Sequence, residues 1–327
     1  AQRSTSVTGI AASTYATVDR WKTAIGSTAG RLTQTQTAIT DLSGFAFATK
    51  LDCTTADTSI AADETLMFHQ RFEGQDLQQL KKGTSDAEKI TVSFFVKGNA
   101  SATYTCELQD TDNARFNSQE FSVTTSFTRV ILTFVADTTG ALTNDNALSF
   151  QLNIHLHSGS TFTGGSHTDN VWHTTANQRV GDNQTSFFDS TDRTFFITGV
   201  QMEVGSVATP FEHRSFGEEL ALCQRYFSHS GDTKNSGFVH SCYNTTDAYG
   251  NFSYPIPMRT APTMTMKASG RNFYSNAASK TITSFAGQNI GTHSFQNRIV
   301  GSGWTAGHAG HVDVDSNTRF YEADAEL

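Results

Sequence analysis

Residues 90–98 read "ITVSFFVKG", and this stretch decides the fold class. Ile90, Val92, Phe94 and Val96 stand at every second position, so their side chains would lie on one face of an extended strand. Similar segments recur about every 10 to 15 residues, a spacing typical of antiparallel sandwiches. We therefore expect strands at 43–52, 65–73, 90–97, 102–109, 114–123, 127–136, 147–156 and 194–204.

Turn-forming residues separate these segments. The stretches "GNAS" (98–101), "DTDNA" (110–114) and "DTTGALTNDN" (137–146) are rich in Asn, Asp and Gly, which tolerate the backbone angles of a chain reversal. More strand-like segments follow residue 236, in "SGFVHSC", "YGNFSYPIPM", "TAPTMTMKA", "KTITSFAG" and "RFYEADAEL". The pattern predicts an all-β chain, with a jelly-roll sandwich first and a smaller C-terminal sandwich after it.

Length and charge exclude several classes of protein. A chain of 327 residues is long enough for two domains, and 25 Phe supply apolar material for their cores. The net charge is −8, and no cluster of cations exceeds the pair Lys81–Lys82, so nucleic acid is not an expected partner. No apolar stretch reaches the roughly 18 residues of a membrane-spanning helix, so membrane insertion is not expected.

One amphipathic helix interrupts the strands. Ser215 and Glu218 have the spacing of a capping box, in which the serine accepts from an exposed amide of the first turn. Phe216, Leu220, Cys223 and Phe227 follow at helical spacings and would form one apolar stripe. We expect a linking helix at 215–228 between a domain at 1–214 and a domain at 229–327, with the stripe packed between domains or subunits.

The polar segment 157–193 is the longest stretch without strand-like alternation, and such insertions often form binding loops or assembly contacts. Within it, "HTDNVWH" (167–173) places Trp172 beside Asp169, Asn170 and His173. An aromatic ring flanked by amide and carboxylate groups suits sugar recognition, so these four residues are the candidate carbohydrate site. The alternative is that Trp172 packs in the core or in a subunit interface.

No catalytic motif is found, and the chain is not expected to be an enzyme. It lacks a G-x-S-x-G elbow, a Walker loop and an H-E-x-x-H pair. Two histidine pairs could bind a metal ion, namely His155 with His157 and His308 with His311, but histidines also stack and form hydrogen bonds without metal. Four carboxylates could supply the acid pair of a glycosidase, but such residues are usually solvated: Glu73, Asp76, Glu203 and Glu212.

No cofactor or metal is expected. Cys53, Cys106, Cys223 and Cys242 lie far apart, which indicates four separate buried thiols. "DTDNA" and "DVDSN" (313–317) begin like a calcium loop, but the position that requires Gly is occupied by another residue in both. Ordinary turns explain both stretches, and a structural calcium assembled from distant loops is the alternative.

Several motifs in order resemble one family of virion proteins. These are "AQRSTSVTGIAASTYATVDRW" (1–21), "QRFEGQDLQQLKKGTSDAEKITVSFFVKG" (70–98), "YTCELQDTDN" (104–113), "ITGVQMEVGSVATPFEHRSFGEELALCQRYF" (197–227), "PMRTAPTMT" (257–265) and "ADAEL" (323–327). The chain resembles tail-fibre or structural proteins of tailed bacteriophages, often marine phages, over nearly its whole length. The resemblance implies a first domain similar to carbohydrate-binding modules and a short segment before Ala1.

The resemblance also implies a function, a location and partners. We expect a non-enzymatic protein on the virion surface, assembled in the host cytoplasm as a tail fibre, head fibre or decoration. Expected partners are other virion proteins, host-surface glycans and copies of the chain itself, with a homotrimer favoured. The alternatives are a carbohydrate-binding module of a secreted polysaccharide-degrading protein and a fibre-borne depolymerase.

Overall fold

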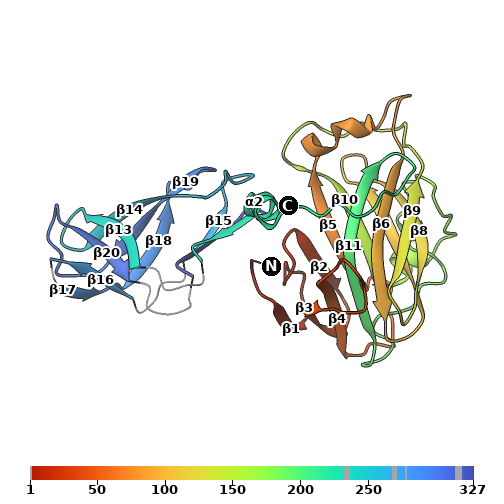
Figure 1. Cartoon of the computed structure of the whole chain (residues 1–327), viewed down its shortest axis with the longest axis horizontal. Helices are drawn as coiled ribbons and strands as arrows, with labels where there is room; N and C mark the ends of the chain where they lie inside the picture. The colour runs from red at the N-terminus through yellow and green to blue at the C-terminus, as the bar shows by residue number, and fades with distance from the viewer. Residues whose placement is uncertain (1, 232–235, 267–270, 277, 314–318) are drawn as a thin grey trace. The chain divides into compact units, whose positions relative to one another are not determined.

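The computed structural model describes residues 2–231, 236–266, 271–276, 278–313 and 319–327, and divides into two compact units (Figure 1). The first unit is Arg3–His213 with Leu327, and the second is Arg214–Glu326 with Gln2. Each unit has a hydrophobic core of its own. The prediction of an all-β chain with a jelly roll, a short helix and a smaller second sandwich is confirmed.

The first unit is a sandwich of two antiparallel sheets, and the chain crosses repeatedly from one sheet to the other, except that β3 and β4 are neighbours in one sheet and β7 and β8 are neighbours in the other. One sheet has the order β1-β3-β4-β11-β6-β9 and the other has the order β2-β5-β10-β7-β8. The strands are β1 (Ser6–Ile10), β2 (Trp21–Gly26), β3 (Arg31–Ala38), β4 (Phe47–Thr55), β5 (Thr65–Glu73), β6 (Ile90–Gly98), β7 (Ala102–Asp110), β8 (Arg115–Val123), β9 (Thr128–Phe134), β10 (Leu148–Ser158) and β11 (Thr194–Val204).

Two-residue alternation fills the space between these sheets. In β6, Val92, Phe94 and Val96 are fully buried, and in β10 the even positions from Phe150 to Leu156 belong to the same core. Burying a Val, Leu, Ile or Phe side chain stabilises a fold by about 1.5–3 kcal/mol. The alternating pattern of the sequence therefore fixes which face of each strand points inward.

The outer face of the five-stranded sheet is covered as well. After β10 the chain runs through α1 (Ser160–Thr163) and the 3₁₀ turn η2 (Ala176–Gln178) before it returns as β11. The odd positions Asn153, His155 and His157 of β10 are fully buried although they point away from the core. The polar segment 157–193 thus covers this face and contributes to a buried polar layer. A second 3₁₀ helix, η1 (Gly74–Leu80), follows β5.

The second unit combines a three-stranded sheet, β12-β21-β15, with a seven-stranded sheet, β17-β16-β20-β13-β14-β19-β18. Phe273, Phe295 and Phe320 are fully buried or nearly so in the core of this unit. The strands are β12 (Phe227–His229), β13 (Ser236–Cys242), β14 (Asp247–Ser253), β15 (Thr263–Met266), β16 (Asn272–Ser275), β17 (Ala278–Thr281), β18 (Ser284–Gln288), β19 (Ser294–Val300), β20 (Ala309–Asp313) and β21 (Tyr321–Asp324).

The predicted helix is α2 (Phe216–Gln224), and its capping box is present: Ser215 accepts from the Glu218 amide while the Glu218 side chain bonds back to the Ser215 backbone. The helix ends before residue 228, because Phe227 begins β12 and pairs with Asp324. Cys223 and Phe227 are buried, Leu220 is half-buried and Phe216 is 82% exposed. The apolar stripe is therefore covered only towards its C-terminal end, and its contact with a domain or subunit stays a prediction.

All four cysteines are buried, as the sequence predicts. Cys53 and Cys106 face the core of the first unit. Burial raises the pKa of the Cys53 thiol to about 11 and also raises the pKa of Cys106. Because the thiolate is the reactive form, these side chains are chemically inert.

Candidate functional site

The predicted sugar site, Asp169 to His173, makes hydrogen bonds to neighbouring backbone. Asn170 accepts from the Val135 amide at 2.8 Å and donates to the Thr133 carbonyl at 3.0 Å. Asp169 accepts from the Glu120 amide at 3.1 Å. Because these groups already bind backbone atoms, they fix the segment on the sandwich.

Trp172 and His173 are held in the same way. The indole Nε1 of Trp172 donates to the Val135 carbonyl at 2.7 Å, and the ring lies beside Phe150. His173 exchanges two backbone hydrogen bonds with Phe116. The structure thus gives Trp172 packing partners on both its polar and its apolar side. Sugar binding by these four residues stays a prediction.

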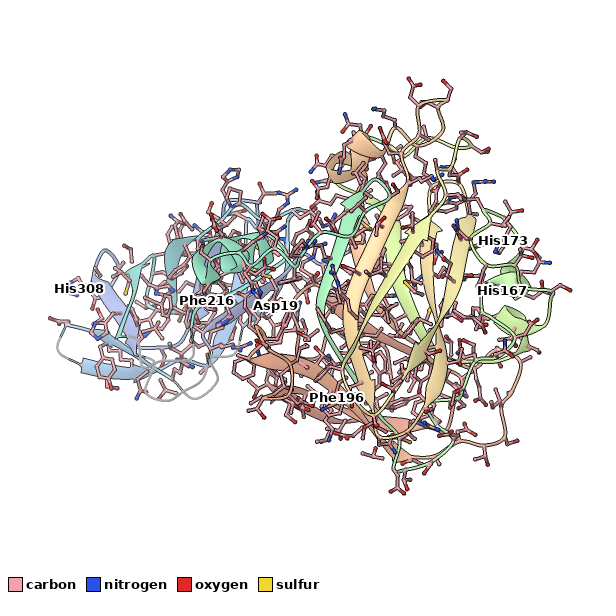
Figure 2. The ribbon with its side chains drawn as sticks, turned by 45° about the vertical axis from the view of Figure 1, so that its right-hand side comes forward. Asp19, His167, His173, Phe196, Phe216 and His308 are labelled. Carbon is pink, nitrogen blue, oxygen red and sulfur yellow. The ribbon has the colours of Figure 1, made fainter. Side chains whose placement is uncertain are left out.

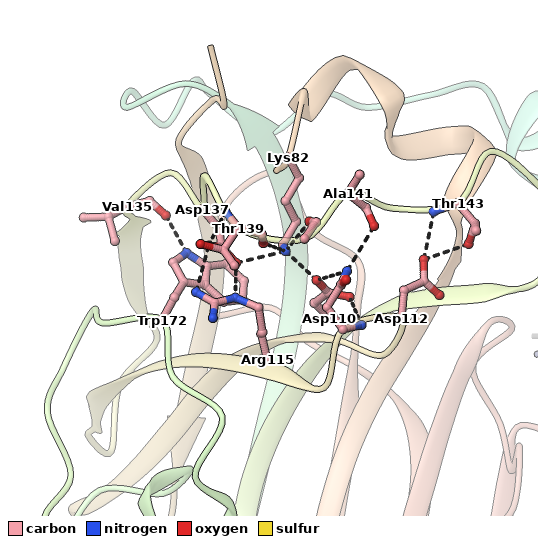
Figure 3. A network of polar contacts seen from close by, with 12 residues as sticks. Lys82, Asp110, Asp112, Arg115, Val135, Asp137, Thr139, Ala141, Thr143 and Trp172 are labelled. Atoms are coloured by element: carbon pink, nitrogen blue, oxygen red, sulfur yellow. Dashed lines mark hydrogen bonds and ion pairs between the residues drawn. The ribbon is translucent and has the colours of Figure 1, made fainter. Parts of the chain in front are cut away.

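The Lys82 ammonium lies in a cage of oxygen atoms next to Trp172 (Figure 3). It donates to the carbonyls of Thr139 and Gly140, both at 2.9 Å, and forms ion pairs with Asp110 and Asp137. The ammonium nitrogen also lies 5.3 Å from the centre of the Trp172 ring, a cation–π contact. This buried group joins η1, β7 and the segment after β9.

The cage continues through Arg115, which pairs with both oxygens of Asp137 at 2.7 and 2.9 Å. Burial raises the pKa of the Asp137 carboxyl, but hydrogen bonds from Arg115 and Lys82 outweigh burial and lower that pKa overall. Two carboxylates and two carbonyls resemble the ligands of a hard metal ion, yet here a lysine fills the space between them. Asp110, the first residue of "DTDNA", therefore binds a side-chain cation, and the second predicted loop, "DVDSN", lies largely outside the described residues.

A second buried network lies on the outer face of the five-stranded sheet. Arg179 forms a bidentate pair with Glu107, and Glu107 also accepts from Asn153 at 2.7 Å and lies 3.0 Å from His155 Nε2. Burial raises the pKa of the Glu107 carboxyl, but Arg179 and His155 together lower it well below its usual range. Because Arg179 and His155 keep the Glu107 carboxylate ionised, Glu107 is a poor candidate for a catalytic acid.

His69 belongs to the same layer and has no hydrogen bond of normal geometry at either ring nitrogen. It is 2% exposed and lies between Lys22 and Asn153 across the sheet. Burial is the main cause that lowers the His69 pKa to about 3, and the charges of Arg71 and Lys22 add to it. His69 is therefore neutral in the folded protein at neutral pH.

His155 and His157 bind different partners, and His311 of the second pair stacks on Tyr274. His155 faces Glu107, whereas His157 binds Glu64 at 2.9 Å and Ser186 at 2.8 Å. Figure 2 shows His167 and His173 on the segment outside the sandwich, where His167 lies 2.9 Å from the Ser118 hydroxyl. Within the described ranges, no three His, Cys, Asp or Glu side chains gather as metal ligands.

The four carboxylates lie in two places, with Glu73 and Asp76 where β5 passes into η1, and Glu203 and Glu212 on and after β11. Glu73 ends β5 in the five-stranded sheet and accepts from Gln75, and Glu203 lies on β11 in the other sheet and accepts from Thr209. Asp76 lies in the first turn of η1, and Glu212 follows Phe211 after β11. Their placement indicates local structural roles.

No helix in the described part of the chain has the length and apolar character to cross a membrane.

An open pocket of about 230 Å³ lies between the two sheets of the first unit. Trp21 and Phe68 stack at 4.7 Å on the five-stranded side, and Phe47, Gln36 and Thr49 line the six-stranded side. Phe47 is the first residue of β4 and is 52% exposed. The pocket could not be predicted from the sequence, because the residues that line it come from strands far apart in the chain: β2, β3, β4, β5 and β11.

The pocket combines aromatic rings with polar groups. The Gln36 side chain makes no hydrogen bond within the described residues, and Thr198 uses its hydroxyl to bind the Phe47 carbonyl at 2.9 Å. The volume lies just below the roughly 300–1,000 Å³ of sites for drug-sized ligands, so the pocket suits a single ring. An uncharged cyclic ligand could pack against the Phe47 ring and form hydrogen bonds with the Gln36 amide.

Comparison with known proteins gives distant structural neighbours. No family model matches the chain. No curated protein matches it either. The family 11 carbohydrate-binding module from Clostridium thermocellum, solved with a β-1,3-1,4-mixed-linked tetrasaccharide, is 8% identical, with a TM-score of 0.31 over 61% of this chain and 100% of that chain.

Two further structures are similarly distant. A structure described as "CBM4 structure and function" is 10% identical, with a TM-score of 0.29 over 56% of this chain and 77% of that chain. Discoidin II of Dictyostelium discoideum is 10% identical, with a TM-score of 0.18 over 82% of this chain and 78% of that chain. The neighbours include carbohydrate-binding modules, but TM-scores of this size identify neither a relative nor a ligand.

Proposed function

We propose that this chain is a non-enzymatic glycan-binding protein that holds a sugar ring in the pocket between the two sheets of its first unit. The observation that carries the proposal is the exposed Phe47 ring and the unpaired Gln36 amide on one wall of the pocket, with the stacked rings of Trp21 and Phe68 on the other wall. Aromatic faces pack against the apolar side of a sugar ring, and an amide can donate to and accept from its hydroxyls.

The absence of charge in this lining favours an uncharged sugar. No ionisable side chain lines the pocket, and the other residues of its walls include Val18, Thr49, Ile197 and Val200. A charged ligand would lose its hydration without gaining a counter-ion there. Because one small pocket gives limited affinity, the chain would depend on several weak contacts acting together.

The pocket is tested with Phe47→Ala and Gln36→Ala on a glycan array, with Phe216→Ala as the matched control, because Phe216 is an exposed aromatic residue on α2. We expect Phe47→Ala to weaken binding of the best neutral glycan about two- to twelvefold, since one aromatic contact is worth about 0.5–1.5 kcal/mol. The control should bind as the wild type does. Equal binding by Phe47→Ala and the wild type would refute the pocket as the site.

Catalysis is tested in the same experiment by measuring release of reducing sugars. We propose adhesion without release, and the support is that Glu73 and Glu203 accept local hydrogen bonds from Gln75 and Thr209 and lie in different sheets. Release of reducing sugar by the wild-type chain would instead support the depolymerase alternative.

We further propose that the protein is displayed on the surface of a bacteriophage particle and attaches it to host glycans. The support for this finer assignment is the set of ordered motifs from residues 1–21 to 323–327, which resembles virion fibre and structural proteins. Repetition of the chain in a homotrimer would raise avidity. Imaging phage particles with a labelled antibody against this chain tests the location, and light scattering of the purified chain tests the trimer. A carbohydrate-binding module of a secreted enzyme is the alternative if no particle is labelled.

A further inference from the structure

We propose that the second unit carries its own binding face for an extended, neutral glycan, on the outer side of the seven-stranded sheet. This inference rests on the proposed function, because it assigns a second site for the same class of ligand. The face is named the Tyr274–Gln288 row and consists of Tyr274, His311, Val239, Asn251, Gln296 and Gln288.

Strand register places these six residues side by side. Tyr274 of β16 pairs with His311 of β20, and His311 pairs with Val239 of β13. Further along the sheet, Asn251 of β14 pairs with Gln296 of β19, which pairs with Gln288 of β18. Ser241 pairs with Tyr249 in the adjoining ladder, so the two-residue period brings Val239 next to Asn251.

The row is open to solvent. Val239 is 62% exposed at its centre, and none of the six side chains is buried. Neighbouring positions with the opposite parity, such as Phe273, Phe295 and Val312, are fully buried or nearly so in the core. One face of the sheet therefore holds the unit together, while the other is free to bind.

The chemistry of the row fits a sugar chain. The rings of Tyr274 and His311 are stacked, with centroids 5.4 Å apart and planes 16° apart, so that two aromatic side chains stand together at one end of the row. Beyond Val239, Gln296 donates to Asn251 at 3.4 Å and accepts from Asn289 at 3.3 Å. The Gln288 amide has no hydrogen bond within the described residues and can bind a ligand hydroxyl.

Charge favours a neutral ligand over an anionic one. The row contains no Asp, Glu, Lys or Arg, although the chain contains 31 acidic and 23 basic residues. On the adjoining strands, Asp247 and Arg298 neutralise each other in an ion pair of 2.6 Å. An anionic polymer would find no Lys or Arg among the six residues of the row, whereas an uncharged polyhydroxylated ligand meets complementary groups.

The extent of the row favours a chain of sugars over a single ring. Six strands cross it, so its ends are separated by five strand spacings of about 4.8 Å, or about 24 Å in all. The first unit offers a pocket for one ring, whereas the second offers a flat track. The two sites would act on different parts of one polysaccharide, or on two chains of it.

The test uses the full chain in affinity gel electrophoresis. The gels contain a neutral polymer (mixed-linked β-1,3-1,4-glucan, laminarin, galactomannan or dextran) or the anionic polymer alginate. Val239→Glu introduces a charge at the exposed centre of the row, and Tyr274→Ala removes an aromatic ring. Ile131→Glu is the matched control, because Ile131 is an exposed β-branched residue on β9 of the first unit. Melting curves show that each variant is folded.

We expect both variants of the row to weaken retardation by a neutral polymer about twofold or more, while Ile131→Glu migrates as the wild type does. Combining Val239→Glu with Phe47→Ala should weaken retardation more than either change alone, because two linked sites lose their avidity.

The other outcomes overturn the proposal in distinguishable ways. If only Phe47→Ala weakens retardation, the pocket binds sugar and the row does not. If the wild type is retarded by no polymer, the proposed function and the row fail together, and retardation by alginate alone refutes the neutral ligand. If Val239→Glu changes the molecular mass in solution and leaves retardation unchanged, the row binds a second copy of this chain.

Discussion

The guanidinium of Arg179 binds both carboxylate oxygens of Glu107, at 2.7 and 2.8 Å, on the outer face of the five-stranded sheet. Glu107 is fully buried, so this pair is an internal ion pair with little access to water. The Arg179 guanidinium also lies 4.3 Å from the centre of the Phe116 ring. One side chain therefore anchors the long segment between β10 and β11 to the sandwich through charge and through packing.

Replacing Arg179 by Met should strongly destabilise the first unit. The change leaves the Glu107 carboxylate buried without its cation, a situation that costs about 3–5 kcal/mol of the free energy of unfolding. Urea unfolding measures the loss. Arg214→Met is the control, because the Arg214–Glu219 pair on α2 is exposed and should contribute less than about 1 kcal/mol. Similar losses in the two variants would show that Glu107 does not need Arg179.

Stability should fall as the pH decreases from neutral. His69 is neutral in the folded state because its pKa is lowered to about 3, whereas the unfolded chain has the usual value of 6.5. Below pH 6.5 the unfolded state therefore binds a proton that the folded state does not, and the stability that is present above 6.5 is lost as the pH falls. Between about pH 6.5 and pH 5 the loss from this group is roughly 2 kcal/mol.

The comparison of His69→Gln with the wild type checks this pH dependence. The variant should show a flatter decrease of the unfolding free energy between about pH 6.5 and pH 5. Some dependence should persist, since burial also lowers the pKa of His173 and His240. Equal slopes in the two proteins would contradict the assignment to His69.

Trp172→Ala should reduce stability more than it reduces glycan binding. The indole donates to the Val135 carbonyl and lies beside Phe150 and the Lys82 ammonium, so its removal should cost about 3 kcal/mol. Thermal melting and glycan binding at a temperature where the variant is folded separate the two effects. Lost binding with an unchanged melting temperature would instead support the sugar platform that the sequence predicts.

Removal of metal ions should not change stability. Lys82 and Arg115 together supply two positive charges for the carboxylates of Asp110 and Asp137, so the charge of this oxygen cage is already compensated. We expect EDTA to leave the melting temperature unchanged, and Lys82→Met to cost about 3 kcal/mol or more, because it leaves two buried carboxylates. A melting temperature that falls with EDTA and recovers with calcium would indicate a metal site elsewhere.

Most strands of the first unit could be predicted from alternation alone. The segment predicted at 65–73 is β5, and the one predicted at 194–204 is β11. The strands β1, β2 and β3 were missed, since "RLTQTQTA" in β3 alternates between Leu or Gln inside and Thr outside, with little apolar contrast. Helix α2 was found by its capping box, but its end was misplaced because Phe227 fits a helical stripe and a strand equally well.

The candidate sites were harder to predict. Trp172 was identified from its polar neighbours, yet those neighbours bind backbone atoms that are distant in the sequence, such as Val135 and Thr133. The pocket around Phe47 and the Tyr274–Gln288 row both depend on which strands are adjacent, and local alternation does not encode strand order. The only sequence signal for the row is the alternation of polar and aromatic residues in β16, β14 and β19.

The buried, weakly acidic cysteines make the chain convenient for site-specific labelling. Since Cys53, Cys106, Cys223 and Cys242 are all enclosed, a maleimide dye would find few native targets on the folded protein. A cysteine introduced at an exposed position such as Ile131 would then be the preferred point of attachment, and fluorescence could follow single molecules on a polysaccharide film.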